Sequence, residues 1–211
     1  NKFLIKKIKL NSKSKILDIG CGRGKILGTL SSRLRLKDKP IGIDITNHKD
    51  KDERIEFKKI NASTFFFKNR NKFDLILIKQ TIHLLSLKEI KKLLSLSKKN
   101  LKKNGKILIF TLETENNELP TFKLMKTKLI KSLRRDKKIL KLITKLYPYK
   151  KNRFTYKVNL IKKKYLRMIE KRYISTLLPL SNKEIQNGMN EINLKYKSNI
   201  KFTDKLICII L

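Results

Sequence analysis

The residues best suited to chemistry lie in one short stretch near the start of the chain. The segment KILDIGCGRGKIL (15–27) places Asp18, Gly20, Gly22 and Gly24 at alternate positions between two apolar runs. Glycine lets the backbone turn sharply and approach a ligand without a Cβ in the way. Such a turn between a strand and a helix can cradle a phosphate, form a plain structural corner, or line a pocket for a different nucleotide-like ligand.

The spacing of these glycines argues against a phosphate ligand. In the dinucleotide fingerprint G-x-G-x-x-G the third glycine comes one residue later than Gly24 does here. A carboxylate at Asp18 repels a pyrophosphate but suits a ligand that carries an ammonium group. A P-loop is excluded, because no Gly-Lys-Ser/Thr sequence ends the motif.

Two further polar residues follow later apolar runs. Asp44 lies near the end of PIGIDI (40–45), where a carboxylate accepts hydrogen bonds from ribose hydroxyls. Asn61 comes near the end of IEFKKINA (55–62), and its amide is suited to the edge of an adenine. An ammonium group, a ribose and an adenine occur together in S-adenosylmethionine, so these residues predict that cofactor and no metal.

Short apolar runs separated by turn residues predict the elements that position these side chains. Several runs are continuously apolar, as are strands buried on both faces of a parallel sheet. Strands are predicted over 15–20, 40–45, 55–62, 73–79 and 105–112, and helices over 25–36 and 86–105. The connections 46–54 and 63–70 are too short for long crossover helices.

The pattern changes after residue 113. The remaining sequence predicts helices over 121–147, 163–178 and 181–197 and strands over 153–160 and 200–211. We therefore expect one α/β domain with an open sheet, divided into a cofactor-binding core (1–113), a basic helical cap (114–180) and a closing helix and strand (181–211).

These motifs resemble the class I S-adenosylmethionine-dependent methyltransferases, of the small-molecule type related to the trans-aconitate methyltransferase group. ILDIGCGRG is similar to the first motif of that family, GIDI to its acidic strand end, and FDLILIKQTIHLL to its fourth-strand motif. LKKNGKILIF is similar to its turn into the fifth strand, with Asn104 in place of a glycine. The resemblance implies a Rossmann-like fold, with a mostly parallel seven-stranded sheet, an antiparallel last strand and a helical cap after strand five.

The resemblance also implies the residues that would hold S-adenosylmethionine. On the methionine and ribose side these are Asp18, Gly20, Cys21, Gly22 and Gly24, where the Cys21 backbone rather than its sulfur is used. The remainder are Asp44 and Ile45 for the ribose strand end, Asn61 and Ala62 for adenine, and Lys79 and Gln80 for the methionine tail. Asn61 stands where the family usually has aspartate.

Candidate catalytic and substrate residues lie at a strand end and in the cap. Lys79 would pair with a carboxylate, and His83 is a candidate general base, since one helical turn between them would place both on one side of the pocket. The alternative for His83 is a polar residue that opens a helix. Arg172, Tyr173 and Ser175 would contact the substrate, and their alternative is a solvated helix face.

The charge of the chain leaves the methyl acceptor open. The net charge is +37, and 44 of the 54 basic residues are lysine, a bias that an AT-rich genome also produces. Residues 121–172 hold 20 basic and two acidic side chains. Such a cap would attract a small anionic substrate, RNA or an anionic membrane. Three functions therefore stay open: a methyltransferase for a small, anionic molecule, an RNA methyltransferase, and a non-catalytic domain.

The location of the protein is predicted from two further features. No apolar run reaches the length that a membrane-spanning helix needs. Cys21 and Cys208 make no disulfide or metal framework. A cytoplasmic protein without a transmembrane segment is therefore expected.

Overall fold

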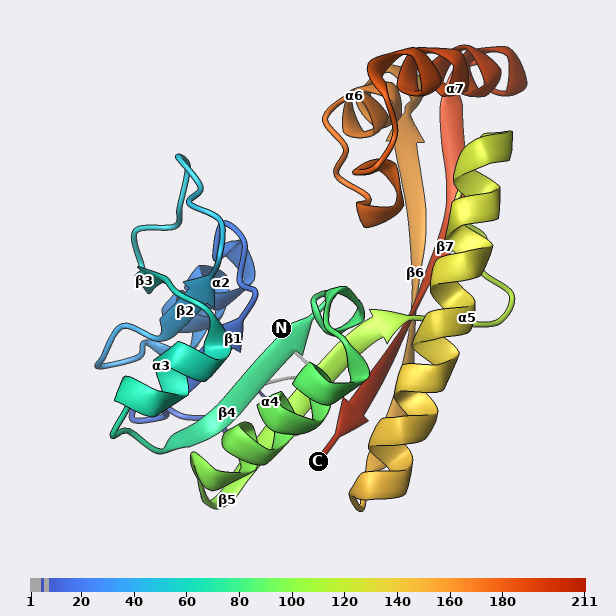
Figure 1. The fold of residues 1–211 in the computed structure, drawn as a ribbon. Helices are drawn as coiled ribbons and strands as arrows, with labels where there is room; N and C mark the ends of the chain where they lie inside the picture. The colour runs from blue at the N-terminus through green and yellow to red at the C-terminus, as the bar shows by residue number, and fades with distance from the viewer. Residues whose placement is uncertain (1–4, 6–7) are drawn as a thin grey trace. The chain divides into compact units, whose positions relative to one another are not determined.

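The computed structural model describes residue 5 and residues 8–211. Its strands form one seven-stranded sheet in the order β3-β2-β1-β4-β5-β7-β6 (Figure 1). The strands are β1 (Ile16–Ile19), β2 (Ile41–Asp44), β3 (Glu56–Lys59), β4 (Phe73–Lys79), β5 (Leu101–Leu112), β6 (Lys150–Ile161) and β7 (Asn199–Ile210). The predicted Rossmann-like class of fold is confirmed.

The chain divides into two compact units. The core unit comprises residues 1–111, 146–152 and 208–211, and the second unit comprises residues 112–145 and 153–207. Strands β5, β6 and β7 have residues in both units.

The core unit is built on parallel strands. Of these, β1 and β4 are buried on both faces, whereas most side chains of the edge strand β3 are exposed. Strands β1, β2, β3, β4 and β5 pair in parallel with their neighbours. Strand β7 runs antiparallel to β5, since Ile107 and Leu211 exchange backbone hydrogen bonds of 3.0 and 3.1 Å. Leu75 and Leu77 on β4 are fully buried, which explains the unbroken apolar run.

The helices of the core unit lie between its strands along the chain. They are α2 (Lys25–Leu34), α3 (Ala62–Lys68), the 3-10 helix η1 (Ile82–Leu84) and α4 (Leu87–Lys99). Ser86 and Glu89 form a capping box at the start of α4, where the predicted helix also begins.

The predicted end of this helix at Gly105 is wrong. The helix ends at Lys99, and residues from Leu101 onward already belong to β5. A Cβ at Gly105 would lie 2.6 Å from the carbonyl oxygen of Phe73. The glycine therefore permits the close approach of two strands, next to a register shift between β4 and β5.

The second unit has its own apolar core. Its helices are α5 (Lys123–Leu146), α6 (Lys162–Glu170), the 3-10 helix η2 (Ser175–Leu177) and α7 (Asn182–Lys195). Phe122, Met125 and Tyr165 pack in this core, with Ile185 and Ile192 from α7. Over the described residues, no helix has the length and apolar character needed to cross a bilayer.

The predicted helix over 163–178 is too long. Helix α6 ends at Glu170, and Arg172 takes a left-handed backbone conformation with φ of 50°. The chain then turns into η2. Apolar spacing continued beyond the helix because this turn also packs into the core through Leu177.

Candidate functional site

The glycine-rich turn after β1 has the backbone conformation that glycine favours. Gly20, Gly22 and Gly24 have φ values of 70°, 55° and 70°. The amides of Gly20 and Cys21 both donate to the carbonyl of Ile43 on β2, at 2.8 and 3.1 Å. The turn is therefore fixed against the end of the neighbouring strand.

Space around the three glycines differs sharply. A Cβ at Gly20 would lie 2.2 Å from Thr81 Oγ1, and one at Gly24 would lie 2.1 Å from Ile55 Cδ1. A Cβ at Gly22 would meet no described atom within 4 Å. Gly20 and Gly24 are thus required by packing, whereas Gly22 faces open space that a ligand can occupy.

Asp18 places a buried carboxyl group at the end of β1. The residue is only 4 % exposed, and no hydrogen-bond donor among the described residues reaches its Oδ1. Burial raises the pKa of Asp18 to about 7; Lys79 opposes this shift and Asp44 adds to it. A cation or a hydrogen-bond donor from a ligand would satisfy this carboxyl group.

Asp44 connects the end of β2 to the glycine turn. Its Oδ2 accepts from the amide of Gly22 and its Oδ1 accepts from the amide of Thr46, each at 2.9 Å. The carboxylate is therefore held in place, and each oxygen retains a lone pair for a further donor. Ile45 follows it and is 72 % exposed, an apolar side chain beside a polar strand end.

Asn61 caps a helix that the sequence did not predict. Its Oδ1 accepts from the amide of Thr64 at 2.9 Å and begins α3, of which Ala62 is the first residue. The oxygen of the amide group that was expected to face adenine is thus engaged in capping. The amide nitrogen is the part of this side chain left for a ligand, and the contact with adenine stays a prediction.

The end of β4 brings three more residues to the turn. Lys79 ends the strand, and Gln80 has a left-handed backbone with φ of 56°. Thr81 Oγ1 lies 3.3 Å from the carbonyl oxygen of Gly20 and 3.1 Å from that of Lys79. Sequence reasoning missed Thr81, which is in the position to hold the glycine turn against β4.

The helical relation expected between Lys79 and His83 is wrong. Lys79 lies in a strand, and the only helix that follows directly is the short η1 that contains His83. The four-residue spacing is therefore not one helical turn. Catalytic roles for both residues stay predictions.

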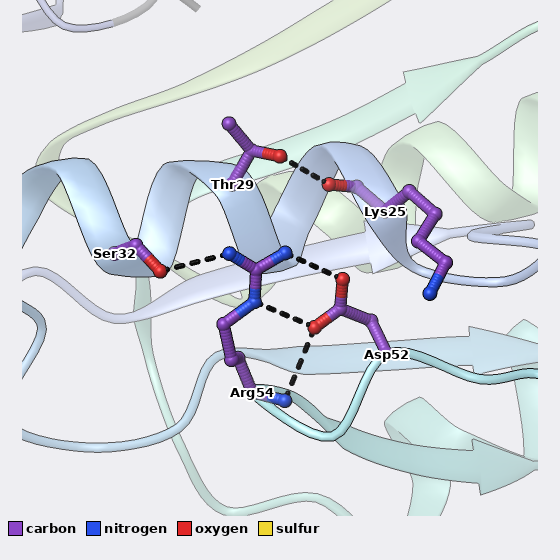
Figure 2. A network of polar contacts seen from close by, with 5 residues as sticks. All are labelled: Lys25, Thr29, Ser32, Asp52 and Arg54. Carbon is purple, nitrogen blue, oxygen red and sulfur yellow. Dashed lines mark hydrogen bonds and ion pairs between the residues drawn. The ribbon is translucent and has the colours of Figure 1, made fainter.

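An unpredicted polar network joins α2 to the loop that holds Asp52 and Arg54 (Figure 2). Asp52 is 6 % exposed, and its carboxylate accepts from Arg54 Nε at 2.8 Å and Nη2 at 2.7 Å. Arg54 Nη1 donates to Ser32 on α2, and the Asp52 amide donates to the carbonyl of Arg23 in the turn. The pKa of Asp52 is lowered to about 2, mainly by its hydrogen bond with Arg54.

One signal in the sequence pointed to this network. Gly28 lies inside the predicted helix 25–36, where glycine costs about 1 kcal/mol relative to alanine. A Cβ at that position would lie 2.3 Å from Asp52 Oδ1. The glycine makes room for the buried carboxylate.

The candidate substrate residues lie in the second unit. Arg172 Nη2 donates to the carbonyl of Leu180 at 3.0 Å and to Asn182 Oδ1 at 2.8 Å, so its guanidinium holds the segment before α7. Tyr173 is 53 % exposed, and Ser175 begins η2. The expected alternative, a solvated helix face, is wrong because this segment is a turn.

Comparison with known proteins identifies the family. A family model described as a methyltransferase domain matches residues 10–172. No curated protein sequence matches this chain.

Solved structures of methyltransferases share the fold over nearly the whole chain. An Anabaena variabilis protein, described as a putative methyltransferase from an antibiotic biosynthesis pathway, is 14 % identical, with a TM-score of 0.64 over 98 % of this chain and 94 % of its own. An Archaeoglobus fulgidus S-adenosylmethionine-dependent methyltransferase is 18 % identical, with a TM-score of 0.58 over 98 % and 90 %. A Geobacter sulfurreducens S-adenosylmethionine-dependent methyltransferase, crystallised with S-adenosyl-L-homocysteine, is 14 % identical, with a TM-score of 0.55 over 99 % and 88 %.

These matches do not single out the trans-aconitate group, which stays a prediction. The predicted class I methyltransferase family is confirmed: the chain belongs to the methyltransferase domain family.

Proposed function

We propose that this chain transfers a methyl group from S-adenosylmethionine to a small, anionic acceptor by in-line displacement. The observation that carries the proposal is the buried carboxyl group of Asp18, without a donor at Oδ1, beside a glycine turn that is open at Gly22. Both the family and the Geobacter neighbour, which was crystallised with S-adenosyl-L-homocysteine, support the same donor.

The residues around the turn fit the parts of S-adenosylmethionine. Asp18 suits the ammonium end, and Asp44 offers one free lone pair on each oxygen to the ribose hydroxyls. The exposed Ile45 would cover an adenine face, with Asn61 and Ala62 at its edge and Gln80 near the methionine tail. The cofactor supplies an activated methyl group, and the protein supplies alignment, which is worth roughly 7–11 kcal/mol in well-oriented reactions.

An anionic acceptor is favoured by the basic residues of the chain. Lys79 at the end of β4 interacts electrostatically with Asp18 and would attract a carboxylate. Residues 121–172 add 20 basic side chains against two acidic ones. A carboxylate needs no general base, whereas a hydroxyl or amine would use His83; Arg172, Tyr173 and Ser175 are the proposed acceptor contacts. We place the reaction in the cytoplasm.

The direct test is transfer of a labelled methyl group. Purified protein would be incubated with methyl-labelled S-adenosylmethionine and either a mixture of small carboxylic acids or total RNA. The proposal expects label in the small-acid fraction. Label in RNA alone would favour the RNA methyltransferase, and cofactor binding without any acceptor would favour a non-catalytic domain.

A further inference from the structure

Two adjoining cavities open at the amino-terminal end of the core sheet. Their volumes are about 600 and 620 Å³, and both are lined by Ile8 and Lys106. Their walls include Ser14, two residues before β1, and Asp74 at the start of β4. We call the two together the lysine groove, defined by Lys9, Lys13, Lys98, Lys106, Lys150 and Lys151.

The groove is positively charged, because its lysines outnumber its acidic lining residues. Its only acidic lining side chain is Asp74, and that carboxylate accepts from Lys102 Nζ and from the amide of Lys15, both at 2.7 Å. None of the six lysines that define the groove forms an ion pair with a described acidic residue. An anion from outside the chain is the natural complement.

Crowding of like charges supports this interpretation. Burial and the nearby Lys106 together lower the pKa of Lys98. The Nζ of Lys98 lies 5.7 Å from the centre of the Tyr147 ring, which is its aromatic neighbour. Because the two ammonium groups repel each other, an anion bound between them would relieve the repulsion.

The groove is distinct from the proposed methyl-transfer site. Asp18 and Lys79 lie at the carboxyl ends of the parallel strands β1 and β4, whereas the groove lies at their amino ends. Four residues of β1 separate the two ends by roughly 10 Å or more. A ligand in the groove therefore does not compete for the cofactor residues.

We propose that the lysine groove binds the phosphate backbone of a single-stranded nucleic acid. The six lysine charges, spread over two adjoining cavities, exceed what one phosphate neutralises. A nucleic-acid strand carries one negative charge per nucleotide and can neutralise several of them. Tyr149 lines the same groove and is 47 % exposed, so its ring offers a base a surface for stacking. This binding does not depend on the proposed methyl transfer.

The test measures binding of a fluorescein-labelled oligouridine by anisotropy over a range of salt concentrations. One variant carries Lys98→Gln, Lys106→Gln, Lys150→Gln and Lys151→Gln. A control with the same change in charge carries Lys126→Gln, Lys131→Gln, Lys138→Gln and Lys141→Gln, all exposed on α5. We expect the groove variant to lose at least about tenfold in affinity and its salt slope to fall by about 2–3, since each single-strand phosphate contact contributes about 0.7.

Three results would overturn the proposal. The first is an equal loss of oligouridine affinity in both variants, which would indicate binding by overall charge. The second is no oligouridine binding by the unsubstituted protein. The third is complete competition by millimolar inorganic phosphate, which would indicate a small-anion site. Oligothymidine run in parallel separates RNA from DNA as the source of the backbone. Unchanged melting temperature and S-adenosylmethionine binding in both variants would show that the substitutions act locally. If the unsubstituted protein failed to bind the cofactor, this would contradict the proposed methyl transfer and leave the proposal for the groove unaffected.

Discussion

At the scale of single residues, the charge state of Asp18 should control cofactor binding. Its pKa in the folded protein is raised to about 7 by burial, and S-adenosylmethionine is a cation that favours the ionised carboxylate. The affinity should therefore rise about tenfold between pH 6 and pH 8. Calorimetric titration at the two pH values would check this, with Asp18→Asn as the variant that should lose the pH dependence.

The same carboxyl group should also affect stability, with a definite sign. The folded pKa lies above the unfolded value of about 3.9, so Asp18 favours folding at acidic pH and this contribution is lost as the pH rises through 7. Asp18→Asn should therefore unfold at higher urea concentration than the unsubstituted protein at pH 8, and the difference should shrink towards pH 5. A constant difference across that range would contradict the assignment.

Asp52 should act in the opposite sense. Its folded pKa of about 2 lies below the unfolded value, so its contribution to stability is full above about pH 4 and is lost as the pH falls towards 2. Asp52→Asn should destabilise the protein by about 1–3 kcal/mol at pH 7, because Arg54 loses a charged partner. Asp50→Asn, which breaks an exposed ion pair with Arg23, is the matched control and should change stability by less than about 1 kcal/mol.

At the scale of elements, different glycines of the turn after β1 serve packing and ligand binding. Alanine at Gly20 or Gly22 incurs about 1–2 kcal/mol for the left-handed backbone, but only Gly20→Ala also collides with Thr81. Gly20→Ala should lower the melting temperature clearly more than Gly22→Ala does, whereas Gly22→Ala should weaken cofactor binding out of proportion to its loss of stability. Similar melting temperatures for the two variants would contradict the packing found here.

The elements that the sequence predicted well are those whose signal is local. Continuous apolar runs predicted the buried strands such as β4, and the predicted helix start at residue 86 agrees with the N-cap of α4 at Ser86. Gly105 was wrongly interpreted as a helix end. The position requires glycine because the carbonyl of Phe73, more than thirty residues away in the chain, leaves no room for a Cβ. The Asp52–Arg54 network was missed for the same reason. Its hydrogen bonds form only because the loop that holds these two residues lies against α2 and the glycine turn.

In the candidate site too, features with a local signal were predicted, and features that depend on distant residues were not. The positions of Asp18 and Asp44 near strand ends followed from their apolar neighbours, and Asp44 accepts a hydrogen bond from the turn at Gly22. The capping role of Asn61 depends on α3, which begins directly after it and was not predicted. The helix predicted across Arg172 was wrong because the residue's partners, Leu180 and Asn182, lie beyond the turn that ends α6.

At the scale of the whole molecule, the net charge of +37 should make stability depend on salt. Repulsion among unpaired lysines destabilises a compact chain, and salt screens it. The melting temperature should therefore rise between low and physiological ionic strength, by scanning calorimetry in sodium chloride. A fall over that range would indicate that attractive ion pairs dominate instead.

The central claim is that the strand ends of the core unit bind S-adenosylmethionine. Isothermal titration of S-adenosylmethionine into the unsubstituted protein, Asp44→Ala and Asp38→Ala tests it most directly, because Asp38 is an exposed aspartate outside the site. We predict binding by the unsubstituted protein, a loss of about 1–3 kcal/mol in Asp44→Ala, and no change in Asp38→Ala. No measurable binding, or equal affinity in all three proteins, would contradict the account.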